Sequence, residues 1–148
     1  VIERPLSAVE DDRAAPQSVE PRAARTAFKR IASFELPLRV DRYPTSRYAL
    51  VELVPDTGRR HQLRRHLVHV SHPIIGDSTY GKGRHNRLFA ERYGVQRLML
   101  ACVGLAFEHP LTGERIGVHA DPGPEFARLT REFGWGPTAG GCGRNGHC

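Results

Sequence analysis

Alternating hydrophobic positions predict the first regular elements of this chain. Residues 25–36 (RTAFKRIASFEL) alternate in part and are rich in aromatic and β-forming side chains, and residues 48–54 (YALVELV) alternate more clearly. Both stretches predict strands, and the proline-containing stretch DRYPTSR between them predicts a connection. Residues 1–23 mix prolines, alanines and acids without a period, which predicts an irregular lead-in.

Helical spacing replaces alternation in the middle of the chain. Leu63, Leu67 and Val70 recur at i, i+4 and i+7 within residues 61–71 (HQLRRHLVHVS), after an Asp-Thr-Gly turn and before a proline. This pattern predicts an amphipathic helix. A second, short helix is expected over residues 86–93, with its apolar side chains turned inward.

The last third of the chain predicts two more strands and a helix. Residues 98–107 (LMLACVGLAF) are the most buried-looking strand, residues 115–119 a short strand, and residues 124–133 a helix with a proline in its first turn. Residues 136–148 (GPTAGGCGRNGHC) lack core-forming side chains. We expect a disordered, glycine-rich tail there, after one domain formed by residues 1–135.

The order of these elements predicts an α+β fold. Strands from residues 25–55 and 98–119 would form a mixed, largely antiparallel sheet, covered by the helix at residues 61–71. With 148 residues, of which 39% are hydrophobic, the chain is long enough for one compact core. It has no apolar run near the roughly 18–20 residues of a membrane span and no signal-peptide start, so we expect a cytoplasmic protein.

Basic charge is concentrated in one segment. The whole chain carries a formal charge of +6, yet between Thr57 and Arg97 nine Lys and Arg residues stand against two acids, an excess of +7. A basic segment of this kind favours a polyanionic partner such as RNA, although it can also be only a solvated face.

Cysteines and histidines do not predict a metal site. Cys142, His147 and Cys148 lie in the tail without a fourth ligand at the spacing of a zinc finger. The histidines of the middle segment point in different directions on a helix, so hydrogen bonding or phosphate contact is the expected role of His61, His66, His69 and His72.

Two arginines are predicted to lie where the middle helix meets the core. At 100° per residue, Arg60 and Arg64 fall on one flank of the apolar stripe, whereas Arg65 and His69 fall on the solvent side. A partly buried guanidinium can hold a carboxylate or phosphate through two parallel bonds. The alternative is an ordinary surface helix. Asp77, in a Gly-Asp-Ser turn, is expected to bond the turn backbone rather than act as a nucleophile.

These residues also carry a family resemblance. The run TGRRHQLRRH at residues 57–66, followed by HPIIGD at 72–77 and Tyr80-Gly81, resembles the third motif and the following segment of the RluA-type pseudouridine synthases. The flanking stretches, YPTSRYALVELVP before it and HNRLFAERYGVQRLML after it, are most similar to the branch of that family that modifies tRNA. The resemblance implies the pseudouridine synthase fold and an RNA uridine isomerase that needs no metal or organic cofactor.

The catalytic aspartate of the family is expected outside this sequence. In that family it lies in an earlier motif, R-L-D-x-x-T-S-G, and no aspartate here follows Arg-Leu. The chain opens on Val1 rather than Met, and VIERPL is similar to the segment after the second motif of the family. We therefore expect the C-terminal portion of a catalytic domain, inactive by itself. The alternative is a truncated or degenerate RNA-binding module without catalysis. A helix-turn-helix has little support, because a proline follows the arginine-rich helix.

The resemblance also implies roles for particular residues. Arg64 matches the arginine that pairs with the catalytic aspartate, and Leu98 and Leu100 match apolar positions beside the uracil pocket, with plain core packing as the alternative. The sequence after the first leucines departs from the family, because Ala101-Cys102 stand where His-Ala is usual. Candidate RNA contacts are Arg59, Arg60, Arg65, Arg84 and Arg87.

Overall fold

The computed structural model describes residues 1–7 and 20–135. The chain divides into two units, Val1–Met99 and Leu100–Cys148, and each unit has its own sheet. The tail predicted to be disordered, residues 136–148, lies outside the described residues.

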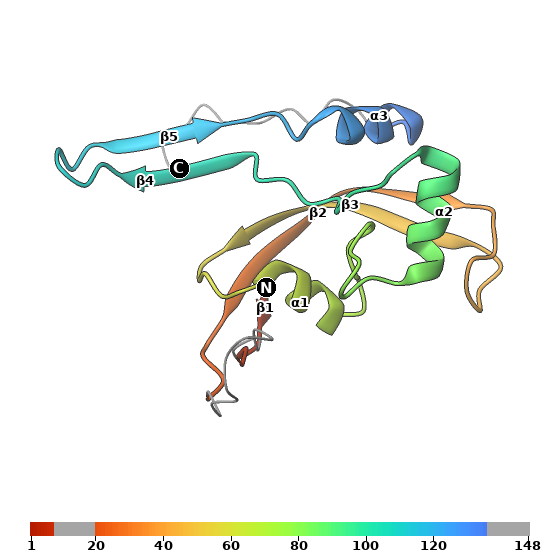
Figure 1. Cartoon of the computed structure of the whole chain (residues 1–148), viewed down its shortest axis with the longest axis horizontal. Coiled ribbons are helices and arrows are strands. Elements are labelled where there is room, and N and C mark those ends of the chain that lie inside the picture. The colour runs from red at the N-terminus through yellow and green to blue at the C-terminus, as the bar shows by residue number, and fades with distance from the viewer. Residues whose placement is uncertain (8–19, 136–148) are drawn as a thin grey trace. The chain divides into compact units, whose positions relative to one another are not determined.

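An antiparallel sheet organises the first unit. Its strands are β1 (Ile2–Glu3), β2 (Arg25–Leu36) and β3 (Ser46–Pro55), in the order β1-β2-β3. The two long strands form the hairpin that crosses this unit (Figure 1). The predicted strand at residues 25–36 is confirmed, and the one predicted at 48–54 lies within β3. The lead-in is less irregular than expected, because β1 pairs with the start of β2.

Two helices follow the sheet in the first unit. Helix α1 spans Gln62–His69 and α2 spans Gly83–Tyr93, so both predicted helices are confirmed. Helix α1 starts one residue later than predicted, because His61 adopts the left-handed conformation (φ 55°). Helix α2 ends where Gly94 takes up φ 60°, a conformation that glycine adopts at no steric cost.

The core of this unit combines apolar and hydrogen-bonded polar side chains. Phe89 of α2 packs edge-on against Tyr48 of β3 and is tilted against Tyr93, with ring centroids 4.7 and 5.2 Å apart. Among the described residues of the unit, the buried polar side chains are Thr26, Ser46, Gln62, His66 and Asp77. Because burying a polar group is costly unless it is bonded, their partners constrain how α1 and the loop after it are placed.

The loop before α2 packs tightly against the chain that follows the helix. Met99 donates its N–H to the carbonyl of Ile75, and a Cβ added to Gly76 would lie only 1.8 Å from the carbonyl oxygen of Arg97. Backbone at residues 97–99 therefore bonds to this loop instead of entering a sheet. For this reason the strand predicted at residues 98–107 is wrong in its first half.

The second unit contains a hairpin and a helix. Strand β4 (Gly104–Glu108) pairs antiparallel with β5 (Arg115–His119), and α3 spans Pro124–Glu132, with its proline at the start as predicted. The described residues thus form two antiparallel sheets and not the single sheet predicted, although the α+β class holds. In the ranges that the structure describes, no helix is long and apolar enough to cross a membrane.

Strand β4 is not the buried strand that its composition predicted. Leu105 faces Val118 and Phe107 faces Ile116 across the hairpin, so these four side chains share one face. Leu105, Phe107 and Val118 are exposed to 58%, 43% and 49%. The expectation failed because, among the strands that the structure describes, β4 pairs with β5 alone, and a two-stranded ladder leaves an apolar face uncovered.

We expect the substitution Gly76→Ala to lower the free energy of unfolding by at least about 2 kcal/mol, because it combines a left-handed backbone (φ 77°) with a clash against the Arg97 carbonyl. Urea unfolding of the chain measures this change. Gly83→Ala is the matched control, since its Cβ would meet no atom within 4 Å and its place is the start of a helix. Equal stability of the two variants would contradict the packing described for the loop.

Candidate functional site

An ion pair between α1 and the following loop forms the centre of the site. Nε of Arg64 donates to Oδ2 of Asp77 at 2.8 Å, and Nη2 donates to Oδ1 at 2.7 Å. The Asp77 side chain is 1% exposed and that of Arg64 is 16% exposed. Arg64 therefore lies at the border between core and surface, as predicted, and binds a buried carboxylate through two parallel hydrogen bonds.

The turn that contains Asp77 also bonds its carboxylate. Oδ1 accepts the backbone N–H groups of Thr79 and Tyr80, each at 2.9 Å. The Arg64 guanidinium, above all, and these two N–H groups lower the pKa of Asp77 to about 2, against the opposing effect of burial. Asp77 bonds its own turn, as predicted, and its carboxylate stays ionised at neutral pH.

Asn86 of α2 holds the same turn from the other side. Its Nδ2 donates to the Asp77 carbonyl at 2.9 Å, and its Oδ1 accepts the Gly76 N–H at 2.9 Å. A Cβ on Gly81 would approach the Asp77 carbonyl oxygen to 2.2 Å, so the turn is as compact as its backbone allows. The carboxylate of Asp77 thus has a fixed position.

Tyr80 lies against the guanidinium of Arg64. The Arg64 Cζ stands 4.9 Å from the centroid of the Tyr80 ring, within the range of a cation–π contact. The Tyr80 hydroxyl shares a hydrogen bond of 3.1 Å with Nδ1 of His61. Burial, together with the charges of Arg64 and Arg60, lowers the pKa of His61. His61 is therefore a neutral hydrogen-bonding group beside the arginines.

Buried hydrogen bonds attach the start of α1 to β2. Nε2 of Gln62 donates to the Arg25 carbonyl at 2.9 Å and to Oγ1 of Thr26 at 3.0 Å. Its Oε1 accepts the Thr57 hydroxyl at 2.8 Å and the Arg59 N–H at 3.1 Å. Every polar atom of the Gln62 side chain is satisfied, so the turn that precedes Arg64 is fixed relative to the sheet.

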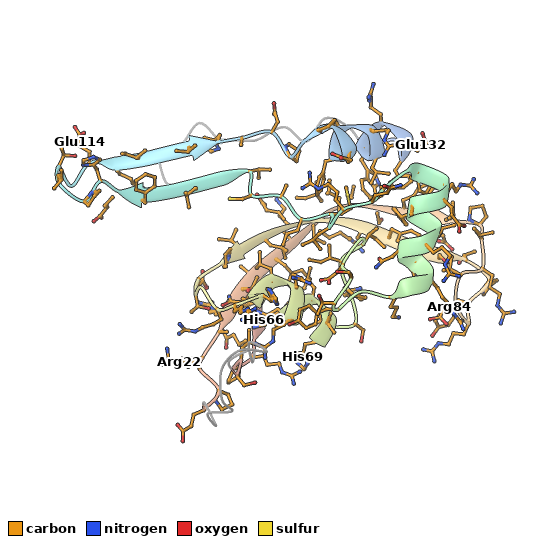
Figure 2. All side chains as sticks on the ribbon, in the orientation of Figure 1. Arg22, His66, His69, Arg84, Glu114 and Glu132 are labelled. Carbon is orange, nitrogen blue, oxygen red and sulfur yellow. The ribbon has the colours of Figure 1, made fainter. Side chains whose placement is uncertain are left out.

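His66 continues this network one turn further along α1. The side chain is fully buried, with Nδ1 2.9 Å from Oγ1 of Thr26 and Nε2 3.2 Å from the Arg4 carbonyl. A carbonyl only accepts, so Nε2 carries the hydrogen and Nδ1 accepts the Thr26 hydroxyl. His66 therefore bonds inside the protein, whereas His69, on the same helix, is exposed (Figure 2).

The placement predicted for Arg60 is wrong. Arg60 precedes α1 and is exposed, because the left-handed His61 breaks the helical phase on which the prediction relied. Arg65 is half-buried rather than on the solvent side, and its Nη1 donates to the Ser7 carbonyl at 2.7 Å. Arg59 is exposed, and its Nε donates to the Ala23 carbonyl at 3.3 Å.

The remaining predicted residues lie away from this ion pair along the chain. Arg84 and Arg87 are exposed on α2, and Figure 2 labels Arg84. Nη1 of Arg84 lies 3.9 Å from Oδ1 of Asp41, which is in the β2–β3 connection. Leu98 belongs to the first unit and Leu100 to the second. Both are half-buried and neither lies in a strand, so the prediction that strand alternation puts them on one face is wrong. Within the described ranges, no three or more His, Cys, Asp or Glu side chains gather as metal ligands do.

Sequence reasoning missed that Asp77 pairs with Arg64. A signal existed, because Asp77 and Glu91 are the only acids between Thr57 and Arg97. A half-buried arginine in that basic segment needs a counter-charge, and Asp77 is the nearer of the two acids in sequence. The contact between the Tyr80 ring and the Arg64 guanidinium could not be predicted from the sequence, because it depends on how the turn folds back.

Comparisons with known proteins agree with one another. Residues 6–69 match the family of RNA pseudouridylate synthases. Three proteins named tRNA pseudouridine synthase C are similar to this chain: that of Vibrio cholerae is 44% identical over 91% of the chain, that of Salmonella typhi 43% over 91%, and that of Yersinia pestis 44% over 84%. These alignments cover 57%, 53% and 48% of the respective relatives. The chain thus spans about half the length of the curated relatives it matches.

The lowered pKa of Asp77 predicts a pH-dependent contribution to stability. A carboxyl group with a pKa of 3.8 when unfolded and about 2 when folded stabilises the fold by about 2 kcal/mol above pH 4, and this contribution is lost as the pH falls towards 2. The free energy of unfolding should therefore differ less between the native chain and Asp77→Asn at pH 2.5 than at pH 6. Urea unfolding of both proteins at pH 2.5 and at pH 6 measures this difference in free energy.

Asp56→Asn is the control for this titration. Asp56 pairs with Arg25 at 3.3 Å, but its side chain is 43% exposed, so its removal should change stability little at either pH. A deficit of Asp77→Asn that stays equal at both pH values would contradict the role assigned to the buried ion pair.

Proposed function

Because the chain belongs to the RNA pseudouridylate synthase family, we propose that it forms part of an enzyme that converts uridine to pseudouridine in tRNA. The observation that carries this proposal is the arrangement of the Arg64 guanidinium, which by the sequence resemblance corresponds to the arginine that pairs with the family's catalytic aspartate. Asp77 accepts from Nε and Nη2, and among residues 1–7 and 20–135 no hydrogen bond is made by Nη1, so the edge formed by Nη1 and the second N–H of Nη2 is left for another planar anion. On this proposal, residues 1–135 are the C-terminal portion of the catalytic domain.

The proposed reaction is an isomerisation that needs no oxidant or reductant. The bond between N1 of uracil and C1′ of ribose breaks, a bond between C5 and C1′ forms, the C5 proton goes to solvent, and N1 gains a proton. An aspartate drives this chemistry in the family. Asp77 does not fit that task, because its carboxylate is buried and accepts bonds from Arg64, Thr79 and Tyr80.

A carboxylate from outside residues 1–148 would therefore complete the site. None of the chain's aspartates follows Arg-Leu; they are Asp11, Asp12, Asp41, Asp56, Asp77 and Asp121. A carboxylate that docks on the open edge of Arg64 stays ionised and oriented, because an arginine within hydrogen-bond distance favours the charged form. Arg64 would thus be the catalytic residue that this chain supplies.

The basic segment around Arg64 would bind the tRNA backbone. Phosphate contacts are sequence-independent and suit accessible guanidinium groups. The candidates are Arg59, Arg60, Arg84 and Arg87, which are exposed, and Arg65, which is half-buried. Leu98 and Leu100 remain the candidates for the wall of the uracil pocket. With tRNA as the proposed substrate, we propose a cytoplasmic enzyme, and the proposed chemistry calls for no cofactor.

Release of tritium from tRNA labelled at C5 of uridine tests this function. The complete reading frame that contains this chain should release tritium, and Arg64→Ala in that protein should lower the rate by at least about 1,000-fold while the circular dichroism spectrum stays native. Residues 1–148 alone should bind tRNA weakly without releasing tritium. Turnover by the isolated chain would refute the external carboxylate. Binding without turnover by the complete protein would instead identify a non-catalytic RNA-binding module.

Arg65→Ala should weaken tRNA binding and reduce its salt dependence. If Arg65 meets a phosphate, the slope of log K against log salt concentration should fall by about one unit, because one fewer counterion is released. Filter binding at several salt concentrations measures the slope. Arg131→Ala, on α3, is a control of equal charge and should leave the slope unchanged. An unchanged slope for Arg65→Ala would exclude Arg65 from the phosphate contacts.

A further inference from the structure

The Arg64 guanidinium has two edges that can each hold a planar acid, and the chain itself uses one of them. Asp77 takes the edge formed by Nε and Nη2, at 2.8 and 2.7 Å. The opposite edge, formed by Nη1 and Nη2, belongs to a side chain that is still 16% exposed. An arginine bonded to a single mobile acid can rotate about its terminal bonds, whereas one fixed at one edge presents the other edge in a defined direction.

Asp77 is suited to fix that edge because it is itself immobile. Its carboxylate accepts two backbone N–H groups of its own turn, and its carbonyl accepts the side chain of Asn86 and the Gly81 N–H. Its side chain is 1% exposed, so water competes little for these bonds. The position of the Arg64 guanidinium is therefore set by backbone atoms of the turn, through one rigid carboxylate.

The ring of Tyr80 adds support on the face of the guanidinium. It lies 4.9 Å from the Arg64 Cζ, and its hydroxyl is held by His61. Edge and face contacts together remove the rotational freedom that an exposed arginine normally keeps. Asp77 and Tyr80 both follow Arg64 closely in sequence and lie in the same unit.

We infer that Asp77, with the ring of Tyr80, is a positioning residue of the isomerase, which holds Arg64 so that its open edge meets the reacting carboxylate. This inference rests on the proposed function. On this inference each of the two residues acts on the reaction only through Arg64. The loss of either residue should therefore lower the rate of the chemical step and leave tRNA binding almost intact.

A double-mutant cycle in the complete protein tests this dependence. Asp77→Asn should lower kcat by about 100-fold with the KM for tRNA within about twofold, because the amide nitrogen faces Nε–H of Arg64 and the fixed edge is lost. In an Arg64→Lys background, where no second edge exists, the same change should cost less than about threefold. An equal factor in both backgrounds would show a general structural effect and overturn the inference.

Two further variants make the cycle decisive. Asp56→Asn, which removes a carboxylate from an exposed pair, should leave kcat within about twofold. If Asp77→Asn does not fold, the same cycle with Tyr80→Leu replaces it, since that variant removes the ring beneath the guanidinium but keeps the ion pair. Coupling of Tyr80→Leu to Arg64 supports the inference, and its absence overturns it.

A measurement on the isolated chain separates this inference from the proposed function. The Nε–H of Arg64, bonded to a buried carboxylate, should exchange slowly with water in ¹⁵N NMR spectra of residues 1–148, and Asp77→Asn should accelerate the exchange at least about tenfold. Fast exchange in the native chain, or no acceleration in the variant, overturns the inference whether or not the complete protein acts on tRNA. Absence of tritium release from the complete wild-type protein, with slow exchange intact, refutes the function and with it the catalytic use of the held arginine.

Discussion

The ion pair between Arg64 and Asp77 is the interaction on which the arrangement of the first unit depends. A carboxylate that is 1% exposed would be strongly destabilising without a counter-charge and enough hydrogen-bond donors. Asp77 has both, from Arg64 on α1 and from the backbone of its own turn. The turn can therefore pack against α2 and the chain after it only while α1 keeps Arg64 in place. One pair thus links a helix, a turn and the approach to the second helix.

Polar contacts hold α1 against the sheet, a role that a broad apolar stripe has in many helices. Of the three residues in its predicted stripe, only Leu67 is buried, whereas Gln62 and His66 are buried and bonded to β2 through Thr26. Directional bonds define the rotation and height of a helix more narrowly than apolar contacts, because a displaced polar group is left unsatisfied. Arg64 lies between Gln62 and His66, so the network that fixes these two also fixes the start of the arginine side chain.

The sequence predicted the secondary-structure elements better than it predicted the contacts between residues. The strand at residues 25–36 and both helices of the first unit follow from periodicity, which is a local property. The strand at 98–107 failed in its first half because those apolar residues bond a distant loop, and Arg60 was misplaced because one left-handed residue, His61, shifted the helical phase. Arg64 was found through the family resemblance and its place on the helix. Its pairing with Asp77 depends on a turn geometry that no hydrophobic pattern encodes.

The contacts that orient Arg64 are local, so the arginine is held in place before another segment completes the site. The ion pair, the Tyr80 ring and the support from His61 and Asn86 all come from within residues 61–86. The entropy of ordering the arginine is therefore lost when this segment folds, and not when the reacting carboxylate arrives. An acid carried by a separate segment then has to align only itself with an edge already in place. This lowers the cost of assembling the site from two parts of a protein and makes the rate sensitive to every group that holds the arginine still.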